Sequence, residues 1–263
     1  MKIPLTKYGL PQLVVFPAML IAAMFVVALG TIALLPAWAV ILVEAILAAI
    51  LVWVLMFFRD PERRCPSDAN LLLAPADGRI TDIEQVRQVD FIEGPALRIG
   101  IFLSIFNVHI NRAPCNVKVE RITYKKGGFM NAMNSQSGRV NESNNLGMIR
   151  TDSPRDRLLV RQISGTIARR IVCAAAEGRE LTGGQRFGMI KFGSRTELYL
   201  PISPCVLRIA HCENEPTEDT QFAIRNTQYE IKCLVKIGDK VQSGLTPLIK
   251  YVERDAKNAE TKD

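Results

Sequence analysis

The hydrophobic residues of this chain gather in one long block near its start. Between Leu13 and Phe58 the only charged residue is Glu44. Pro36 divides the block into two segments, and each is long enough to supply the roughly 20 residues of a membrane-spanning helix. A secretory signal peptide would have a shorter apolar core, followed by a polar mature start rather than a second apolar segment. The pattern therefore predicts a two-helix membrane anchor over residues 1–58.

Basic residues flank both ends of this block. They are Lys2 and Lys7 before it, and Arg59, Arg63 and Arg64 after it. Because positive flanks favour the cytoplasmic side, both ends are expected there, as a hairpin requires. We therefore expect the cytoplasmic (inner) membrane, with the rest of the chain on the cytosolic side. Glu44 leaves two arrangements open, a hairpin that spans the bilayer and one that inserts shallowly into one leaflet.

After residue 58 the pattern changes to short aliphatic and β-branched runs, separated by Gly, Asn, Asp and Pro clusters. Examples are ALRIGIFLSIF at 96–106 and ELYLP at 197–201. Runs of this kind are typical of strands, and no long low-complexity linker divides them. The sequence predicts one mostly β domain over residues 59–252, followed by a polar tail at 253–263.

Two segments of this domain have less obvious structures. RRIVCAAAEG, at 169–178, fits both a strand and the spacing of a helix. NSQSGRVNESNNL, at 134–146, is rich in Asn and Ser, so we expect it to form an exposed loop over the functional site. Six cysteines are scattered without a CxxC pair, which predicts reduced thiols with packing roles in a cytosolic domain.

An internal repeat sharpens the prediction of the fold. EGRELTGGQRFGMIKF (177–192) and IGDKVQSGLTPLIKY (237–251) align with an offset of 60 residues. The aligned glycines, at positions where positive φ is expected, are Gly178 with Gly238 and Gly184 with Gly244. The pattern resembles the hairpins of biotinyl and lipoyl carrier domains, without a lysine at the tip, and PADGRITDI is a weaker third copy. We predict an α+β, mostly β fold, a small barrel or sandwich with lipoyl-like hairpins behind two apolar membrane helices.

The charge of the chain limits the classes of partner that we expect. With 33 Lys+Arg against 26 Asp+Glu, the formal net charge is +7, and most of the excess lies after residue 58. A basic domain attached to a membrane is attracted to anionic headgroups. Nucleic acid is not expected as a partner, since no zinc-finger spacing, aromatic RNA-binding signature or basic helix is present. A generally solvated basic surface remains an equal interpretation.

Three short motifs contain complementary chemistry. APADG places Asp77 in a tight turn, NVHINRAP places His109 among apolar residues, and KFGSR places Ser194 after a glycine. Each alone has an ordinary structural explanation, as a turn, a core histidine or a loop. Together they supply an orienting carboxylate, a general base and a nucleophilic hydroxyl, the set that activates serine.

Several motifs, in order, resemble the phosphatidylserine decarboxylase proenzymes, specifically the short membrane-attached bacterial form. They are FFRDPER (57–63), PADGRI (75–80), FNVHINRAP (106–114), ARRIV (168–172) and GQRFGMIKFGSR (184–195). The resemblance implies a catalytic domain that cleaves itself at the bond between Gly193 and Ser194. The products would be a β chain ending at residue 193 and an α chain starting at residue 194, which stay together without a covalent link.

The resemblance also implies the roles of the candidate residues. Ser194 would attack the Gly193 carbonyl and become a pyruvoyl group, a self-generated cofactor that needs no metal. His109 would act as base, with Asp77 orienting its imidazole. The pyruvoyl group would form a Schiff base with phosphatidylserine, release CO2 and leave phosphatidylethanolamine. Some longer relatives have a second histidine where this chain has Phe106, so the source of the later proton stays open.

The sequence leaves several alternatives open. A membrane-bound serine hydrolase could use Asp77, His109 and Ser194 without self-cleavage, although Ser194 lies outside a G-x-S-x-G motif. A non-catalytic membrane-tethered scaffold is a third interpretation, and the sequence leaves open whether the chain forms a homo-oligomer. Basic residues that suit phosphate oxygens, or are ordinary surface charges, are Arg112, Lys125, Lys126, Arg169 and Arg170.

Overall fold

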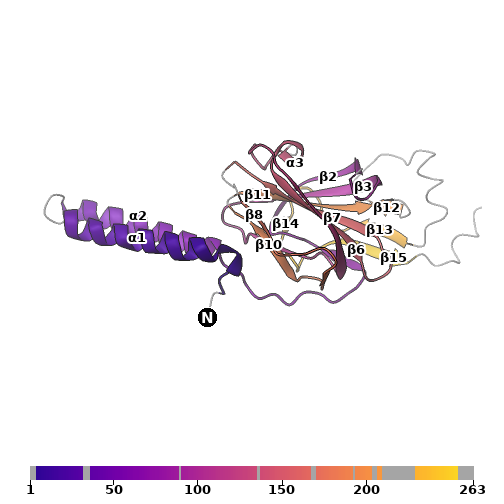
Figure 1. The fold of residues 1–263 in the computed structure, drawn as a ribbon, viewed down its shortest axis with the longest axis horizontal. Helices are drawn as coiled ribbons and strands as arrows, with labels where there is room; N and C mark the ends of the chain where they lie inside the picture. Colours follow the sequence, from indigo (N-terminus) through magenta and orange to yellow (C-terminus); the bar gives the residue numbers. More distant parts are fainter. Residues whose placement is uncertain are drawn as a thin grey trace, which may run out of the picture. The chain divides into compact units, whose positions relative to one another are not determined.

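The computed structural model describes residues 4–31, 36–88, 90–134, 137–166, 170–191, 193–202, 206–208 and 229–253. By its internal contacts the chain forms two units. The first contains residues 1–62 and 106–108, and the second contains residues 63–105 and 109–263. Figure 1 shows the helices of the first unit and the strands of the second.

The first unit is a helical hairpin. A short 3-10 helix, η1 (Lys7–Gly9), leads into α1 (Leu10–Thr31), and α2 (Ala37–Phe57) returns. Both long helices have the length and apolar composition of membrane spans. The two ends of the hairpin are tied together, because Thr6 N donates to Phe58 O (2.9 Å) and Asp60 N donates to Pro4 O (2.7 Å). The two apolar helices expected from the sequence are confirmed.

The second unit is built almost entirely of strands, as predicted. RRIVCAAAEG contributes a strand, β8, and not a helix. The elements are β1 (Leu71–Leu73), β2 (Gly78–Gln88), β3 (Gly94–Leu103), β4 (Ile110–Arg112), β5 (Val117–Lys125), α3 (Ser137–Val140), β6 (Ser143–Arg150), β7 (Arg157–Ser164), β8 (Ile171–Cys173), β9 (Glu180–Leu181), β10 (Arg186–Ile190), β11 (Ser194–Pro201), β12 (Val206–Arg208), β13 (Tyr229–Cys233), β14 (Lys240–Val241) and β15 (Pro247–Glu253).

The described part of this unit contains three sheets. The largest has eight strands in the order β14-β2-β3-β11-β7-β6-β5-β9. A three-stranded sheet, β4-β10-β8, and a four-stranded sheet, β1-β15-β13-β12, complete it. The eight-stranded sheet curls like half of a barrel, so the barrel-like mostly β fold expected from the sequence is confirmed. Strand β11, which begins at Ser194, lies inside the large sheet between β3 and β7.

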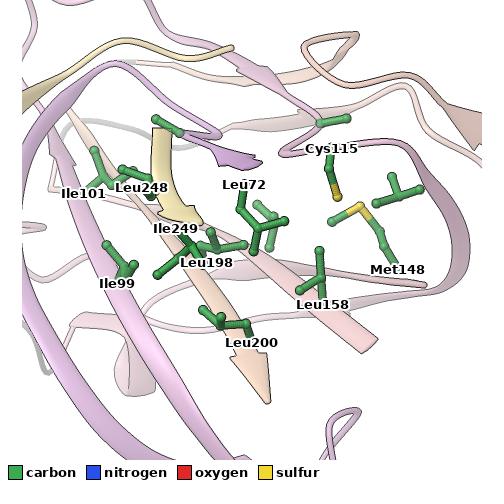
Figure 2. Close-up of a cluster of buried hydrophobic side chains, with 14 of the residues drawn as sticks. Leu72, Ile99, Ile101, Cys115, Met148, Leu158, Leu198, Leu200, Leu248 and Ile249 are labelled. Carbon is green, nitrogen blue, oxygen red and sulfur yellow. The ribbon is translucent and has the colours of Figure 1, made fainter. Parts of the chain in front are cut away.

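One face of the large sheet packs on the main hydrophobic core. Strand β11 contributes Leu198 and Leu200, which are fully buried. Figure 2 shows them converging with side chains of other strands, among them Ile99, Met148 and Ile249. Because side chains alternate along a strand, Ser194 and Thr196 point to this same inner side, whereas Arg195 and Glu197 point to the outer side.

The internal repeat has a clear structural counterpart. All four aligned glycines have positive φ, 81° at Gly178 against 95° at Gly238, and 77° at Gly184 against 71° at Gly244. Each hairpin of the repeat pairs with a different long strand, β9 with β5 and β14 with β2. PADGRITDI is therefore not a third copy of the hairpin. It leads into β2, the strand on which the second hairpin packs.

The expectation of an exposed loop is wrong for much of residues 134–146, although Asn134, Arg139 and Val140 are exposed. Within the polar stretch 134–146, Asn141, Ser143 and Asn144 are buried, and β6 starts at Ser143. The Asn144 side chain donates to Gln162 Oε1 (3.0 Å), and Asn141 makes hydrogen bonds to backbone groups. These asparagines are inside because their amides satisfy buried polar groups. Composition alone suggested a loop exposed to water.

Candidate active site

The peptide link between Gly193 and Ser194 lies at the start of β11. Gly193 has φ of +65°, in the left-handed region that glycine adopts without strain. Ser194 is fully buried and pairs in register with Leu103 on β3 and Ser164 on β7. Among the described residues its Oγ has no hydrogen-bond partner. A buried hydroxyl without a hydrogen-bond partner lowers the stability of a fold, so packing alone does not explain the Ser194 hydroxyl.

The carbonyl of Gly193 is packed tightly against a second glycine. A Cβ atom at Gly165 would overlap the Gly193 carbonyl oxygen, and it would also lie 3.3 Å from Cβ of Ala132. Gly165 follows Ser164, the β7 residue in register with Ser194. Only a residue without a side chain leaves the Gly193 carbonyl in this place. The sequence did not indicate Gly165, because this residue provides space for the Gly193 carbonyl oxygen and not a functional group.

A buried polar network ties β4 to this region. Asn111 Nδ2 donates to Thr196 Oγ1 (3.1 Å), and Asn111 Oδ1 accepts from Gln162 Nε2 (2.9 Å). Gln162 in turn accepts from Asn144, and all four side chains are buried. His109 is also fully buried, two residues before Asn111, and Ser194 lies two residues before Thr196. We refer to Asn111, Asn144, Gln162 and Thr196 as the amide ladder.

Asp77 has a defined set of partners. Both of its carboxylate oxygens accept from the Arg63 guanidinium, at 2.6 and 2.7 Å, and Oδ1 also accepts from Ser243 N (2.8 Å). The repeat provides a comparison, since Asn116 Oδ1 accepts from Gly183 N (2.9 Å) at the matching place of the other hairpin. The contact with Ser243 is thus a structural feature of this turn. The buried ion pair with Arg63 is specific to Asp77, because the amide of Asn116 carries no charge.

Arg63 makes a buried contact that its place after the apolar block does not predict. Its position after the apolar block suggested a membrane-flanking charge, yet its side chain is only 6% exposed and lies on Asp77. It also donates to Ser243 O (2.7 Å). The sequence signal for Arg63 was its place in FFRDPER, one of the motifs that carry the resemblance.

A second buried charge cluster lies on the outer side of β11. Arg195 Nε donates to Glu197 Oε1 (2.8 Å), and the guanidinium also pairs with Asp82. Glu197 accepts from Tyr199 OH (2.6 Å). Burial alone would lower the pKa of the Arg195 guanidinium, but the charges of Glu197 and Asp82 raise it. The guanidinium therefore stays protonated. This cluster fixes the strand immediately after Ser194.

Other basic candidates divide into buried and exposed residues. Arg112 is buried and donates to Gly184 O (3.1 Å), so it supports a turn. Lys125, Lys126 and Arg170 are exposed, and Arg169 lies outside the described residues. Two residues before Gly193, burial and then the charge of Arg170 lower the pKa of the Lys191 ammonium. The described residues contain no group of three or more His, Cys, Asp or Glu side chains arranged to hold a metal.

Comparison with known proteins gives a consistent result. The sequence model of the family described as "Phosphatidylserine decarboxylase" matches residues 50–246. Three similar relatives are each called phosphatidylserine decarboxylase proenzyme. The one from Desulfotalea psychrophila is 42% identical over 74% of this chain and 77% of its own length. Those from Carboxydothermus hydrogenoformans and Symbiobacterium thermophilum are 42% and 45% identical, over 67% and 69% of this chain, and each is covered to 82%. The chain therefore belongs to the phosphatidylserine decarboxylase family.

Proposed function

We propose that this chain is a proenzyme that cuts itself between Gly193 and Ser194 and then decarboxylates phosphatidylserine to phosphatidylethanolamine. The observation that carries the proposal is the buried Ser194 hydroxyl, placed directly after a left-handed glycine, in a chain of this family. A serine hydrolase with the same residues would need Ser194 open to an external substrate. Full burial of Ser194 instead suits an attack on its own neighbouring peptide group.

The cleavage uses only atoms of the chain. Ser194 Oγ attacks the Gly193 carbonyl carbon, the C–N bond breaks, and an ester joins the two residues while the amine of residue 194 takes up a proton. Loss of the Cα proton of residue 194 then expels the Gly193 carboxylate and leaves dehydroalanine. Water converts this group to a pyruvoyl group and ammonia. The products are a β chain, 1–193, and an α chain, 194–263.

His109 is the proposed base for the serine proton. The contact between Asn111 and Thr196 joins β4 to β11, and each of these residues follows its candidate by two positions. Residues two apart in extended chain share a face, which supports placing the imidazole beside the hydroxyl. We propose that Asp77 orients the imidazole, and its ion pair with Arg63 holds the carboxylate in place.

The residues at this place fit a pyruvoyl group at position 194. The group would be held by the hydrogen bonds of β11 to β3 and β7, and its environment would be the buried one that now surrounds Ser194. When formed, it supplies the electron sink that decarboxylation of an amino acid requires. Phosphatidylserine is the proposed substrate, and the two apolar helices are proposed to keep the enzyme at the cytoplasmic membrane, where this lipid resides.

Two assays on the purified full chain test the proposal. Wild type should run on a denaturing gel as fragments 1–193 and 194–263 and should release CO2 from defined phosphatidylserine. Ser194→Ala should run as one chain and release none. An intact wild-type chain would contradict the proposal, as would CO2 release by the Ser194→Ala protein.

The roles of His109 and Asp77 need a separate comparison. His109→Ala should slow cleavage by about 100-fold or more, the usual contribution of a general base. Asp77→Asn should slow it too, while retaining an oxygen that accepts from Ser243 N. Because this change also leaves Arg63 without its carboxylate, the melting temperature must be measured beside the cleavage rate. Normal cleavage by His109→Ala would remove the imidazole from the base role.

A further inference from the structure

The segment between β5 and β6 exposes more apolar surface than a solvated loop needs. The described residues 126–134 and 137–140, which we call the β5–β6 loop, include four exposed large apolar side chains. They are Phe129 at 38%, Met130 at 38%, Met133 at 60% and Val140 at 49% exposure. Single exposed apolar residues are common, but several within one short loop indicate an interaction surface.

The charge of the segment identifies the class of partner. From Arg121 to Asn141 there are four basic residues and no acidic one. Lys125, Lys126 and Arg139 lie closest to the apolar side chains, and all three are exposed. Apolar side chains combined with surrounding cations are the pattern of a surface that lies on an anionic bilayer. A purely apolar protein partner would leave these cations unexplained.

The β5–β6 loop is held at the cleavage site by specific contacts. Asn141, fully buried, exchanges hydrogen bonds with the backbone of Met130, both of 2.7 Å, and its Nδ2 also donates to Ser164 O (2.7 Å). Ser164 N in turn donates to Glu142 O (2.9 Å). Since Ser164 is the register partner of Ser194, the loop joins the strand residue that faces the reacting serine.

A second contact places the loop next to the Gly193 carbonyl. Ala132 is buried, although its neighbours in the loop, Asn131 and Met133, are exposed. Its Cβ would lie 3.3 Å from a Cβ placed on Gly165, the residue against which the Gly193 carbonyl packs. The inner side of the loop therefore borders the reacting group, while Phe129, Met130 and Met133 face outward.

We propose that the β5–β6 loop is a membrane-docking surface, which inserts its apolar side chains into an anionic phospholipid bilayer. This extends the proposed function, because a headgroup of that bilayer would then lie beside residue 194. The lysines and Arg139 would contact lipid phosphates at the same depth. Docking of this kind lets a diacyl lipid present its headgroup without leaving the membrane.

Depth-dependent quenching tests the surface without reference to activity. The two native tryptophans, Trp38 and Trp53, both lie in α2 and are replaced by Phe in the full chain. Met133→Trp is then measured in vesicles of phosphatidylglycerol or phosphatidylcholine with brominated acyl chains. Ile237→Trp, at a position 64% exposed in another turn, is the matched control.

We expect strong quenching of Met133→Trp in phosphatidylglycerol, weaker quenching in phosphatidylcholine, and little for Ile237→Trp in either. Lys126→Gln should reduce the difference between the two lipids. Equal quenching at both positions, or none at Met133→Trp, would overturn the proposal. These readouts stay valid even if the chain releases no CO2, so a failure of the proposed function is distinguishable.

A kinetic comparison provides the second test. Met133→Asp should cleave itself normally, since Met133 does not touch the reacting groups. Its CO2 release from phosphatidylserine in vesicles should fall roughly tenfold, because a charge replaces an apolar side chain that enters the bilayer. Release from a short-chain phosphatidylserine dissolved as monomers should be unchanged. An equal loss with both substrates would argue against a docking role.

Discussion

Around the Gly193 carbonyl, glycine is favoured at two positions for two different reasons. Gly193 itself has a left-handed φ of +65°, and its carbonyl occupies the space that a side chain at Gly165 would fill. The first requirement concerns conformation and the second concerns volume. Both act on the carbonyl that Ser194 is proposed to attack, and attack depends on geometry to within about 1 Å.

Gly165→Ala should therefore slow self-cleavage, by about 100-fold, because the added Cβ displaces the Gly193 carbonyl from the hydroxyl. Cleavage is followed by gel after synthesis of the chain. Gly94→Ala is the control, since a Cβ there meets nothing within 4 Å. Loss of folding is checked by comparing the melting temperatures of Ser194→Ala with and without Gly165→Ala. Normal cleavage by a folded Gly165→Ala protein would contradict this role.

Cys115 provides a test of burial that is independent of the active site. Burial raises the pKa of its thiol from 9.0 to about 12. At pH 8 this leaves about a thousandfold fewer thiolates, and the thiolate is the form that alkylating agents attack. Iodoacetamide should therefore label Cys115 far more slowly than the half-buried Cys65, and denaturant should remove the difference. Mass mapping of labelled peptides that found equal rates in the folded protein would refute the burial of Cys115.

The sequence selects Gly193 and Ser194 as candidates, because both stand in a motif whose proposed chemistry depends on residue type. It was insufficient for Gly165, whose role comes from a carbonyl that is distant along the chain. It was also insufficient for Arg63, because a basic residue after an apolar block has an equally good explanation as a membrane flank. Only the fold brings Arg63 onto Asp77.

At the scale of elements, the amide ladder explains how short strands keep the site in register. β4 has only three residues, yet Asn111 joins it to Thr196 on β11 and Gln162 on β7. Hydrogen bonds between buried side chains are specific in direction, unlike apolar packing. They fix the position of β4, and therefore of His109, relative to the strand that starts at Ser194.

Thr196→Val keeps the side-chain shape but removes the acceptor for Asn111. We expect a loss of about 1 kcal/mol in stability and a slower cleavage, since β4 loses its direct link to β11. Asn111→Ala should cost more, because it leaves both Thr196 and Gln162 without this partner. A double-mutant cycle, read by melting temperature in the uncut Ser194→Ala background, should show strong coupling between the two positions. Additive effects would indicate that the contact contributes nothing.

The strands that the sequence predicts are those with a run of apolar residues. The repeat of two hairpins was visible because its glycines recur with a fixed offset, and all four have positive φ. The polar start of β6 was missed, since Asn141, Ser143 and Asn144 have the composition of a loop. They are buried because β7 and the β5–β6 loop offer them hydrogen-bond partners, and no local sequence pattern reports such partners.

At the scale of the whole molecule, the chain combines an apolar helical hairpin with a β unit of this decarboxylase family. The composition predicted this combination because the two parts differ so sharply in charge and hydrophobicity. It did not indicate that the β unit itself has an apolar and basic loop beside Ser194. In this account the hairpin keeps the enzyme at the membrane, and the loop brings lipid headgroups to the reacting group.

The central claim is that residue 194 becomes a pyruvoyl group when the chain cuts itself. Intact mass spectrometry of the smaller fragment, from wild type purified in detergent, tests this most directly. The account predicts a fragment 194–263 that is lighter by one ammonia than the same peptide with an N-terminal serine, and that resists Edman degradation. A fragment with a free N-terminal serine, or a single chain of residues 1–263, would contradict it.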